Sequence, residues 1–243
     1  MEIVEVNNIK AYTSLFKYVS KGTTAKCYRY DDDKIIKVYR DTPRKKALFD
    51  RRNMFELLEY LGDIKNDSYL GTEKIFTTNG NIVAYSMPYA KGRTLMNMDR
   101  SVSIPVLLEQ LKKLRLDTYK VMELEYRIQD MHDRNIIYSK EDGFKVIDLD
   151  GGVKFSTYGN KNLEMHNLKE LKTTIIKAML KIPYRYDIEF VDRELETMYQ
   201  SLDDNIDHLI LEMVKYTKCE EPNVSDLTKK KLKMVNLRYP EVE

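Results

Sequence analysis

The sequence contains little cysteine, no long apolar run and almost no net charge. Its two cysteines, Cys27 and Cys219, lie far apart, which excludes a zinc-type cysteine cluster and fits a reducing compartment. No apolar stretch is long enough to cross a membrane, and the first five residues do not form a signal-peptide pattern. These absences predict a cytoplasmic protein.

Repeats and low-complexity segments are also missing. Basic residues cluster at 40–52 and 229–233, but few aromatic residues stand among them to stack on bases, and the formal net charge is only +2. Solvated helix faces explain both clusters, so nucleic acid is not an expected partner. The chain has 243 residues, of which 42% are hydrophobic, and this is enough to bury the core of one two-lobed domain.

The hydrophobic pattern changes along the chain. Up to residue 89, β-branched and aromatic residues alternate with turns, apart from one helical pattern at 43–61 that Gly62 ends. A long helix is predicted from Ile104, with Pro105 in its first turn. The tail from Pro222 is expected to dock on this helical part or on a partner. Further helices are predicted at 163–181, 187–202 and 204–218.

Two short apolar segments flank a polar turn near the middle of the chain. Residues 136–138 and 144–147 are mostly apolar, and the turn at 139–143 contains a glycine. This pattern predicts a β-hairpin. Its outer ends carry Asn135 and Asp148.

Asp130, Asn135 and Asp148 stand at intervals of five and thirteen residues, and Lys37 lies far upstream in an apolar strand pattern. One aspartate can orient an attacking hydroxyl and receive its proton, while the asparagine and the second aspartate can hold Mg²⁺ on the phosphates of ATP. Oxygen ligands alone suit Mg²⁺. The combination indicates a phosphoryl-transfer site, in which Lys37 would pair with the phosphates of the nucleotide. Taken alone, a lysine in an apolar strand is usually an edge residue with its head in solvent.

These residues give the chain a resemblance to the protein-kinase-like superfamily, from about residue 18 to about residue 180. Lys37 resembles the lysine of that family's V-A-I-K strand, and Glu56 stands where the family places a helix glutamate. Asp130 and Asn135 resemble the two ends of the catalytic-loop D-x-x-x-x-N. Asp148 resembles the aspartate of D-F-G.

The resemblance implies an α+β, bilobal protein-kinase-like fold. A small β-rich N-lobe with one main helix would occupy residues 1–90, and a mainly helical C-lobe would occupy residues 91–243. The nucleotide lid is expected at a glycine loop that keeps only the central glycine of the family's pattern; taken alone, this segment would be interpreted as an ordinary β-turn. The hinge that binds adenine is expected at the end of the N-lobe. The residues expected to bind the nucleotide are Gly22, Thr23, Thr24 and Ala25 in the lid, and Met87, Pro88 and Ala90 in the hinge.

The catalytic loop departs from the protein-kinase pattern. His132 replaces the lysine that protein kinases often carry two residues after the catalytic aspartate, so the loop resembles the D-x-H-x-x-N of aminoglycoside and choline kinases. His132 is expected either to contact the terminal phosphate or to brace the loop. In many protein kinases an arginine directly before the catalytic aspartate binds the phosphorylated activation loop. This arginine is missing here.

Two acidic positions leave alternatives open. The metal motif continues Asp148-Leu149-Asp150-Gly151, and Asp150 is expected either to add a metal ligand or to be a solvated loop residue. Glu56 is expected to hold Lys37, but Glu59 lies one turn further along the same helical pattern and is the alternative.

The resemblance implies a kinase that uses ATP with Mg²⁺ or Mn²⁺. A serine or threonine hydroxyl of a protein is the favoured acceptor, because the segment from hinge to catalytic loop is short, as in compact protein kinases. A small-molecule acceptor of the aminoglycoside or choline kinase type is the alternative. A pseudokinase that acts as a binding module, and transfer of AMP instead of phosphate, also stay open.

Overall fold

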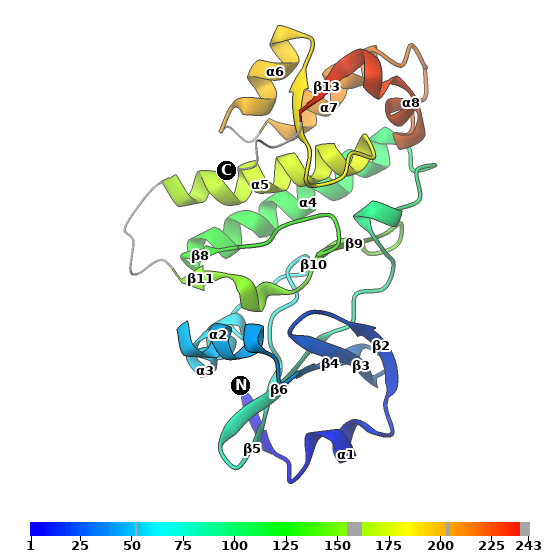
Figure 1. Cartoon of the computed structure of the whole chain (residues 1–243). Coiled ribbons are helices and arrows are strands. Elements are labelled where there is room, and N and C mark those ends of the chain that lie inside the picture. Colours follow the sequence, from blue (N-terminus) through cyan, green and yellow to red (C-terminus); the bar gives the residue numbers. More distant parts are fainter. Residues whose placement is uncertain (52, 155–161, 203–204, 239–243) are drawn as a thin grey trace. The chain divides into compact units, whose positions relative to one another are not determined.

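The computed structural model describes residues 1–51, 53–154, 162–202 and 205–238. It is an α+β structure, with a β-sheet as the main element of the N-terminal part and most helices in the C-terminal part (Figure 1). The chain divides into two compact units: Met1–Ala90 with Ile147–Asp150, and Lys91–Val146 with Gly151–Glu243. The first unit is therefore discontinuous in sequence. Residues 155–161, in the polar loop after the metal motif, lie outside the described residues.

Six strands form the sheet of the first unit, in the order β1-β5-β6-β4-β3-β2. β1 runs parallel to β5, and the other neighbours are antiparallel. β4 and β6 are thus paired on both sides, which suits their apolar composition. The strands are β1 (Glu2–Glu5), β2 (Lys17–Lys21), β3 (Ala25–Asp31), β4 (Lys34–Tyr39), β5 (Lys74–Thr78) and β6 (Asn81–Pro88).

The two faces of this sheet have different roles. Because side chains alternate along a strand, Ile36 and Val38 of β4 face one side, where they join an apolar core with Phe76. Helix α1 (Ile9–Thr13) follows an Asn8 cap and packs aromatic side chains on this core, with the ring centroid of Tyr12 5.6 Å from that of Phe76. Lys37 and Tyr39, the alternate residues of β4, face the other side.

The single helix predicted at 43–61 is wrong, because two helices are present. α2 (Pro43–Arg51) and α3 (Met54–Leu61) are separate, and Asn53 begins the second helix by accepting a hydrogen bond from the amide of Glu56 at 3.3 Å. The backbone of Asn53 is extended, as is usual for a residue that caps a helix start, so a continuous helix cannot run through it. The buried residues of α3 are Met54, Leu57, Leu58 and Leu61.

The second unit begins with short strands and a long helix. α4 (Ile104–Glu123) has Pro105 in its first turn, as predicted, and lies beside α5 (Asn162–Met179) (Figure 1). No helix in the described ranges is both long and apolar enough to cross a membrane. The short elements are β7 (Arg93–Thr94), the 3-10 turn η1 (Leu95–Asn97), β8 (Tyr126–Arg127), β9 (Ile136–Ser139), β10 (Gly143–Val146) and β11 (Val153–Lys154).

The predicted hairpin is confirmed. β9 and β10 pair antiparallel, from Ser139 opposite Gly143 to Ile136 opposite Val146. Gly143 has a φ of 69°, a left-handed conformation that glycine adopts without steric cost, and this fixes the turn. Asn135 therefore directly precedes the last pair of the hairpin, and the metal motif directly follows it.

The helix predicted over 187–202 is only partly present. Residues 187–190 form β12 (Asp187–Phe190), which pairs with β13 (Val235–Arg238), and α6 (Arg193–Gln200) starts only after its Asp192 cap. α7 (Ile206–Lys215) follows near the predicted position. Residues 187–190 alternate polar and apolar side chains, which fits a strand, and the partner strand β13 that pairs with them lies almost fifty residues away.

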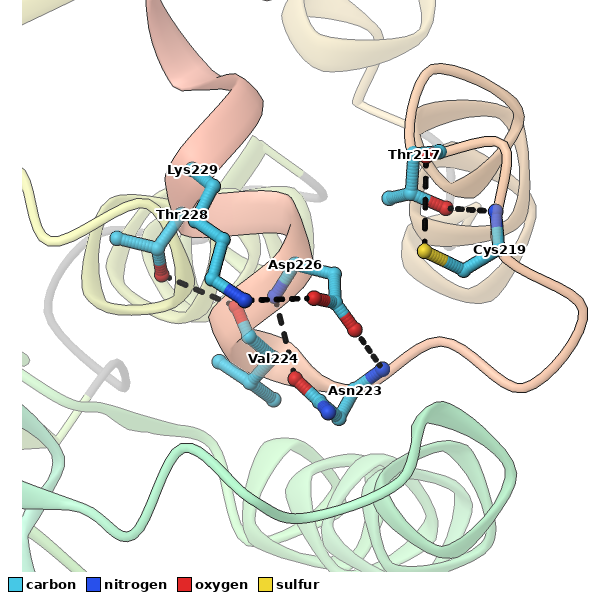
Figure 2. A network of polar contacts seen from close by, with 7 residues as sticks. All are labelled: Thr217, Cys219, Asn223, Val224, Asp226, Thr228 and Lys229. Atoms are coloured by element: carbon cyan, nitrogen blue, oxygen red, sulfur yellow. Dashed lines mark hydrogen bonds and ion pairs between the residues drawn. The ribbon is translucent and has the colours of Figure 1, made fainter.

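The tail from Pro222 packs on the second unit. α8 (Val224–Met234) begins with a capping box, in which Asn223 and Asp226 exchange side chain–backbone hydrogen bonds of 3.2 Å (Figure 2). The carbonyl of Pro222 accepts a hydrogen bond from the amide of Ile104 at 3.0 Å. Of the two alternatives for the tail, docking on the helical part is thus the one that is seen.

Candidate functional site

Lys37 lies in the centre of the first unit's sheet with almost no contact with solvent. The whole residue is 6% exposed, and its Nζ donates to Oδ1 of Asp150 at 2.6 Å and forms a second ion pair with Asp148. The two aspartates are more than a hundred residues away in the sequence. The buried ammonium is therefore compensated by two carboxylates from the metal motif.

The metal motif presents its two carboxylates differently. Asp148 has a φ of 65°, which is uncommon for a residue with a side chain but tolerated best by asparagine and aspartate. Its side chain is 42% exposed, whereas that of Asp150, in the 3-10 turn η2 (Leu149–Gly151), is 5% exposed. Asp148 can thus reach a ligand from solvent, and Asp150 points inward.

Two tyrosines complete the surroundings of Lys37. The hydroxyl of Tyr39 donates to Oδ2 of Asp150 at 2.9 Å. Tyr85 is the cross-strand partner of Lys37, and its ring centroid lies 5.5 Å from Nζ, within the range of a cation–π contact. Burial, with the nearby charge of Asp150, raises the pKa of Tyr39 well above its ordinary value. Tyr39 is therefore a hydrogen-bond donor at any physiological pH.

The charges of this cluster are strongly linked. Burial alone lowers the pKa of Lys37, but the charges of Asp150 and Asp148 outweigh it and raise that pKa above its usual value. Burial alone would raise the pKa of Asp150, but the charge of Lys37 and the hydrogen bonds from Lys37 and Tyr39 hold it below its usual value. Lys37 and Asp150 are thus a charged pair at neutral pH.

The predicted nucleotide lid is the turn between β2 and β3. The amide of Gly22 donates to the carbonyl of Ala25 at 2.9 Å, and Nη1 of Arg40 donates to the carbonyls of Gly22 and Thr23 at 3.0 and 3.2 Å. Gly22 and Thr23 are exposed, Thr24 is half-buried and Ala25 is buried. Arg40, which the sequence did not single out, therefore fixes the tip of this turn.

The predicted hinge residues lie at the end of β6 and just after it. Met87 is buried opposite Ile35, and Pro88 is paired with Lys34 as the last residue of the strand. The next amide, that of Tyr89, donates to the carbonyl of Asp33 at 2.6 Å, and Ala90 is the last residue of this stretch of the first unit. Met87, Pro88 and Ala90 thus lie at one end of β6.

The predicted catalytic loop is a compact turn in the second unit. Asp130 has a φ of 64° and a side chain that is 68% exposed. Nδ2 of Asn135 donates to the carbonyl of Asp130 at 3.0 Å, and the amide of Asn135 donates to the carbonyl of His132 at 2.9 Å. The loop therefore folds back on itself with the carboxylate of Asp130 facing solvent.

His132 braces this loop from within. Its Nδ1 accepts a hydrogen bond from the amide of Arg134 at 3.1 Å, and its Nε2 lies 3.5 Å from Oδ1 of Asp130. An Nδ1 that accepts leaves the proton on Nε2, which then points toward the carboxylate of Asp130. The ring of Tyr184 lies against His132, with centroids 5.9 Å apart.

Two buried side chains of α5 hold the approach to the loop, and the sequence analysis missed both. Asn167 accepts from the amide of Ile128 at 3.0 Å and donates to the carbonyl of Tyr126 at 2.8 Å. Thr174 donates to the carbonyl of Met131 at 2.7 Å. These two polar residues stand seven apart, on one helix face, within an otherwise apolar stripe. That spacing was the signal available in the sequence.

The expected pairing of Lys37 with Glu56 is not seen. Glu56 and Glu59 are both exposed, because α3 turns its apolar residues inward and carries both glutamates on its other faces. Within the described part of the chain, the ion pairs of Lys37 are those with Asp148 and Asp150. Neither glutamate is therefore the partner of Lys37.

Each unit carries an oxygen-bearing side chain of a kind that magnesium binds, Asp148 in the first unit and Asn135 in the second. The exposed carboxylate of Asp148 is a donor of the kind Mg²⁺ takes, and Asn135 turns its Nδ2 toward a backbone carbonyl, which leaves its Oδ1 to act as the ligand atom. Among the described residues, no three histidine, cysteine, aspartate or glutamate side chains gather into a group able to hold a metal. Mg²⁺ needs only one or two protein ligands beside phosphates.

Comparisons with known proteins gave no relative: the chain matched no protein-family model, and a sequence search of curated proteins found no significant match.

Proposed function

We propose that this protein is an ATP-dependent phosphotransferase with a protein-kinase-like bilobal fold, which moves the γ-phosphate of Mg-ATP to a hydroxyl acceptor. The observation that carries the proposal is the contact between Lys37 and Asp148. The motif spacing by itself predicts phosphate binding for Lys37 and metal binding for Asp148, and the two side chains meet although they are far apart in the sequence.

The residues of the first unit hold the nucleotide in this proposal. Lys37 contacts the phosphates with its ammonium group, and the turn at Gly22 covers them with its backbone amides. Met87 lines the adenine pocket, and the backbone of Pro88 and Ala90 hydrogen-bonds the adenine edge. Asp148 would supply an oxygen ligand to Mg²⁺, which would neutralise charge on the phosphates.

The catalytic loop acts on the acceptor. The exposed carboxylate of Asp130 hydrogen-bonds the acceptor hydroxyl and aligns its oxygen with the γ-phosphorus. The acceptor oxygen bonds to that phosphorus as the bond from phosphorus to the bridging oxygen of ADP breaks. The hydroxyl proton passes to Asp130, and His132 keeps the carboxylate oriented.

A second observation supports these assignments. Asp130 and Asp148 both have left-handed backbone conformations, at φ values of 64° and 65°. Such conformations cost free energy and are often found at functional sites, but Asn79, Glu125, Lys181 and Lys218 share them, so they support the assignments only together with the motif spacing. The favoured acceptor is a serine or threonine hydroxyl of a protein. We also propose a cytoplasmic setting, which supplies Mg-ATP and keeps the free Cys27 and Cys219 reduced.

The test uses ATP labelled separately on the γ- and α-phosphates. Purified protein is incubated with Mg²⁺ and each label, alone and with cell extract, and the label is followed on proteins and on small molecules. γ-Label on protein that depends on Asp130 supports the favoured acceptor, and γ-label on metabolites makes the enzyme a small-molecule kinase. α-Label would show AMP transfer. ATP binding without transfer would make the protein a pseudokinase.

Two matched variants decide whether the transfer uses this loop. Asp130→Asn keeps the shape of the side chain and removes the base, and it should lower the rate by roughly a hundred- to ten-thousandfold. Asp133→Asn makes the same chemical change three residues further along and should keep most of the activity. Equal rates in Asp130→Asn and wild type would overturn the proposed role of Asp130.

A further inference from the structure

Asp150 has different surroundings from Asp148, the other acidic residue of the metal motif. Its Oδ1 accepts from Nζ of Lys37 and its Oδ2 accepts from the hydroxyl of Tyr39, at 2.6 and 2.9 Å. We propose that Asp150 is the positioning residue of Lys37, the part that the sequence predicted for Glu56. This inference rests on the proposed function, because the position of Lys37 matters for holding the phosphates.

The geometry argues against Asp150 as a metal ligand. Both of its carboxylate oxygens already bind donors of β4, and its side chain is 5% exposed. Mg²⁺ usually keeps several of its waters, so a carboxylate on the solvent side of the motif suits it better than one enclosed beside Lys37. Asp148, whose side chain is 42% exposed, meets this condition, and Asp150 does not.

The same geometry explains how Asp150 would fix Lys37. Lys37 and Tyr39 are alternate residues of one central strand and so project from the same face, and a single carboxylate binds both. If Asp148 turns to a metal ion when the nucleotide binds, Lys37 still has one buried counter-charge. The ammonium then stays charged and in place beside the phosphates.

The first test separates positioning from metal binding. ATP affinity and the Mg²⁺ requirement are measured for wild type, Asp150→Asn, Lys37→Met and the double variant. Asp150→Asn should weaken ATP binding by roughly ten- to a hundredfold, the effect of a lost charge-assisted hydrogen bond. Its Mg²⁺ requirement should not change, and the double variant should bind no more weakly than Lys37→Met. A raised Mg²⁺ requirement with additive losses would make Asp150 a metal ligand instead.

The second test needs neither ATP nor activity. Acetic anhydride modifies accessible lysine amines, and mass spectrometry gives the modification rate of Lys37 relative to the other lysines. Asp150→Asn should raise the rate at Lys37 several-fold, whereas Glu56→Gln should leave it unchanged. Tyr39→Phe, which keeps the charge of Asp150, should have a smaller effect and serves if Asp150→Asn does not fold.

The two tests keep the two proposals apart. If wild-type protein does not bind ATP, the proposed function is wrong, but the modification rates still decide whether Asp150 holds Lys37. An unchanged rate at Lys37 in a folded Asp150→Asn variant would overturn the positioning role, even in an active enzyme.

Discussion

Replacing Asn167 with alanine should destabilise the second unit more than any exposed polar substitution. The side chain is fully buried and serves two backbone groups of the segment that leads to the catalytic loop, the amide of Ile128 and the carbonyl of Tyr126. Each of the two buried groups that loses its partner costs about 1–3 kcal/mol, so Asn167→Ala should lower the free energy of unfolding by about 2–6 kcal/mol.

The size of the expected effect makes it easy to measure. In a protein of this size, 1 kcal/mol corresponds to about 2–4 °C in Tm, so calorimetry should show a decrease of at least about 4 °C and up to roughly 24 °C. Asn167→Asp keeps the acceptor for Ile128 but loses the donor to Tyr126, and it should also be destabilised. The control is Asn236→Ala, on the exposed strand β13, which should change stability by less than about 0.5 kcal/mol.

One result would refute this reasoning. If Asn167→Ala shifts Tm by no more than Asn236→Ala does, water or another group must satisfy both backbone partners, and the side chain does not hold the segment. A loss of phosphotransfer at a temperature where Asn167→Ala is still folded would show, in addition, that α5 orients the loop of Asp130.

Two further outcomes follow from other parts of the structure. Gly92→Ala should destabilise the protein strongly, because φ is 126° and a Cβ would collide with the backbone carbonyl oxygen of Tyr138 in β9. Gly80→Ala, with open space around the new Cβ, should lower the free energy of unfolding by only about 1 kcal/mol. Urea unfolding of both variants measures these losses, and equal losses of unfolding free energy would contradict the steric argument. Burial and the Arg127 charge lower the pKa of His166 below 6.5, so the unfolded chain takes up the proton first and stability falls as pH drops below that value. His166→Gln should therefore gain stability relative to wild type at pH 5 compared with pH 8, and an equal difference at both pH values would contradict this sign.

Elements fixed by local residues were predictable from the sequence. The hairpin of β9 and β10 carries its own turn glycine, Gly143, and α4 carries Pro105 in its first turn, and both were confirmed. The break before α3 was also visible, since Asn53 is followed three residues later by Glu56, a spacing typical of a helix start. The error at 43–61 came from giving apolar periodicity more weight than the cap.

Features that depend on distant partners were not predictable. β12 pairs with β13, far along the chain, and four residues of polar–apolar alternation at 187–190 were too short to decide between a strand and the start of a helix without that partner. The partner of Lys37 is a similar case. The sequence offered Glu56 at the spacing of a known family, but the inward face of α3 is apolar, and the buried carboxylate that binds Lys37 came from Asp150.

The discontinuous first unit has a consequence for synthesis on the ribosome. All six strands of its sheet are complete by Pro88, but the carboxylates that neutralise Lys37 belong to Ile147–Asp150. A nascent chain that has only reached residue 90 would have to bury an ammonium without a counter-charge, which is strongly unfavourable. The sheet therefore gains its final stability only after residue 150 has emerged, and a fragment cut at residue 90 would lack part of its own interior.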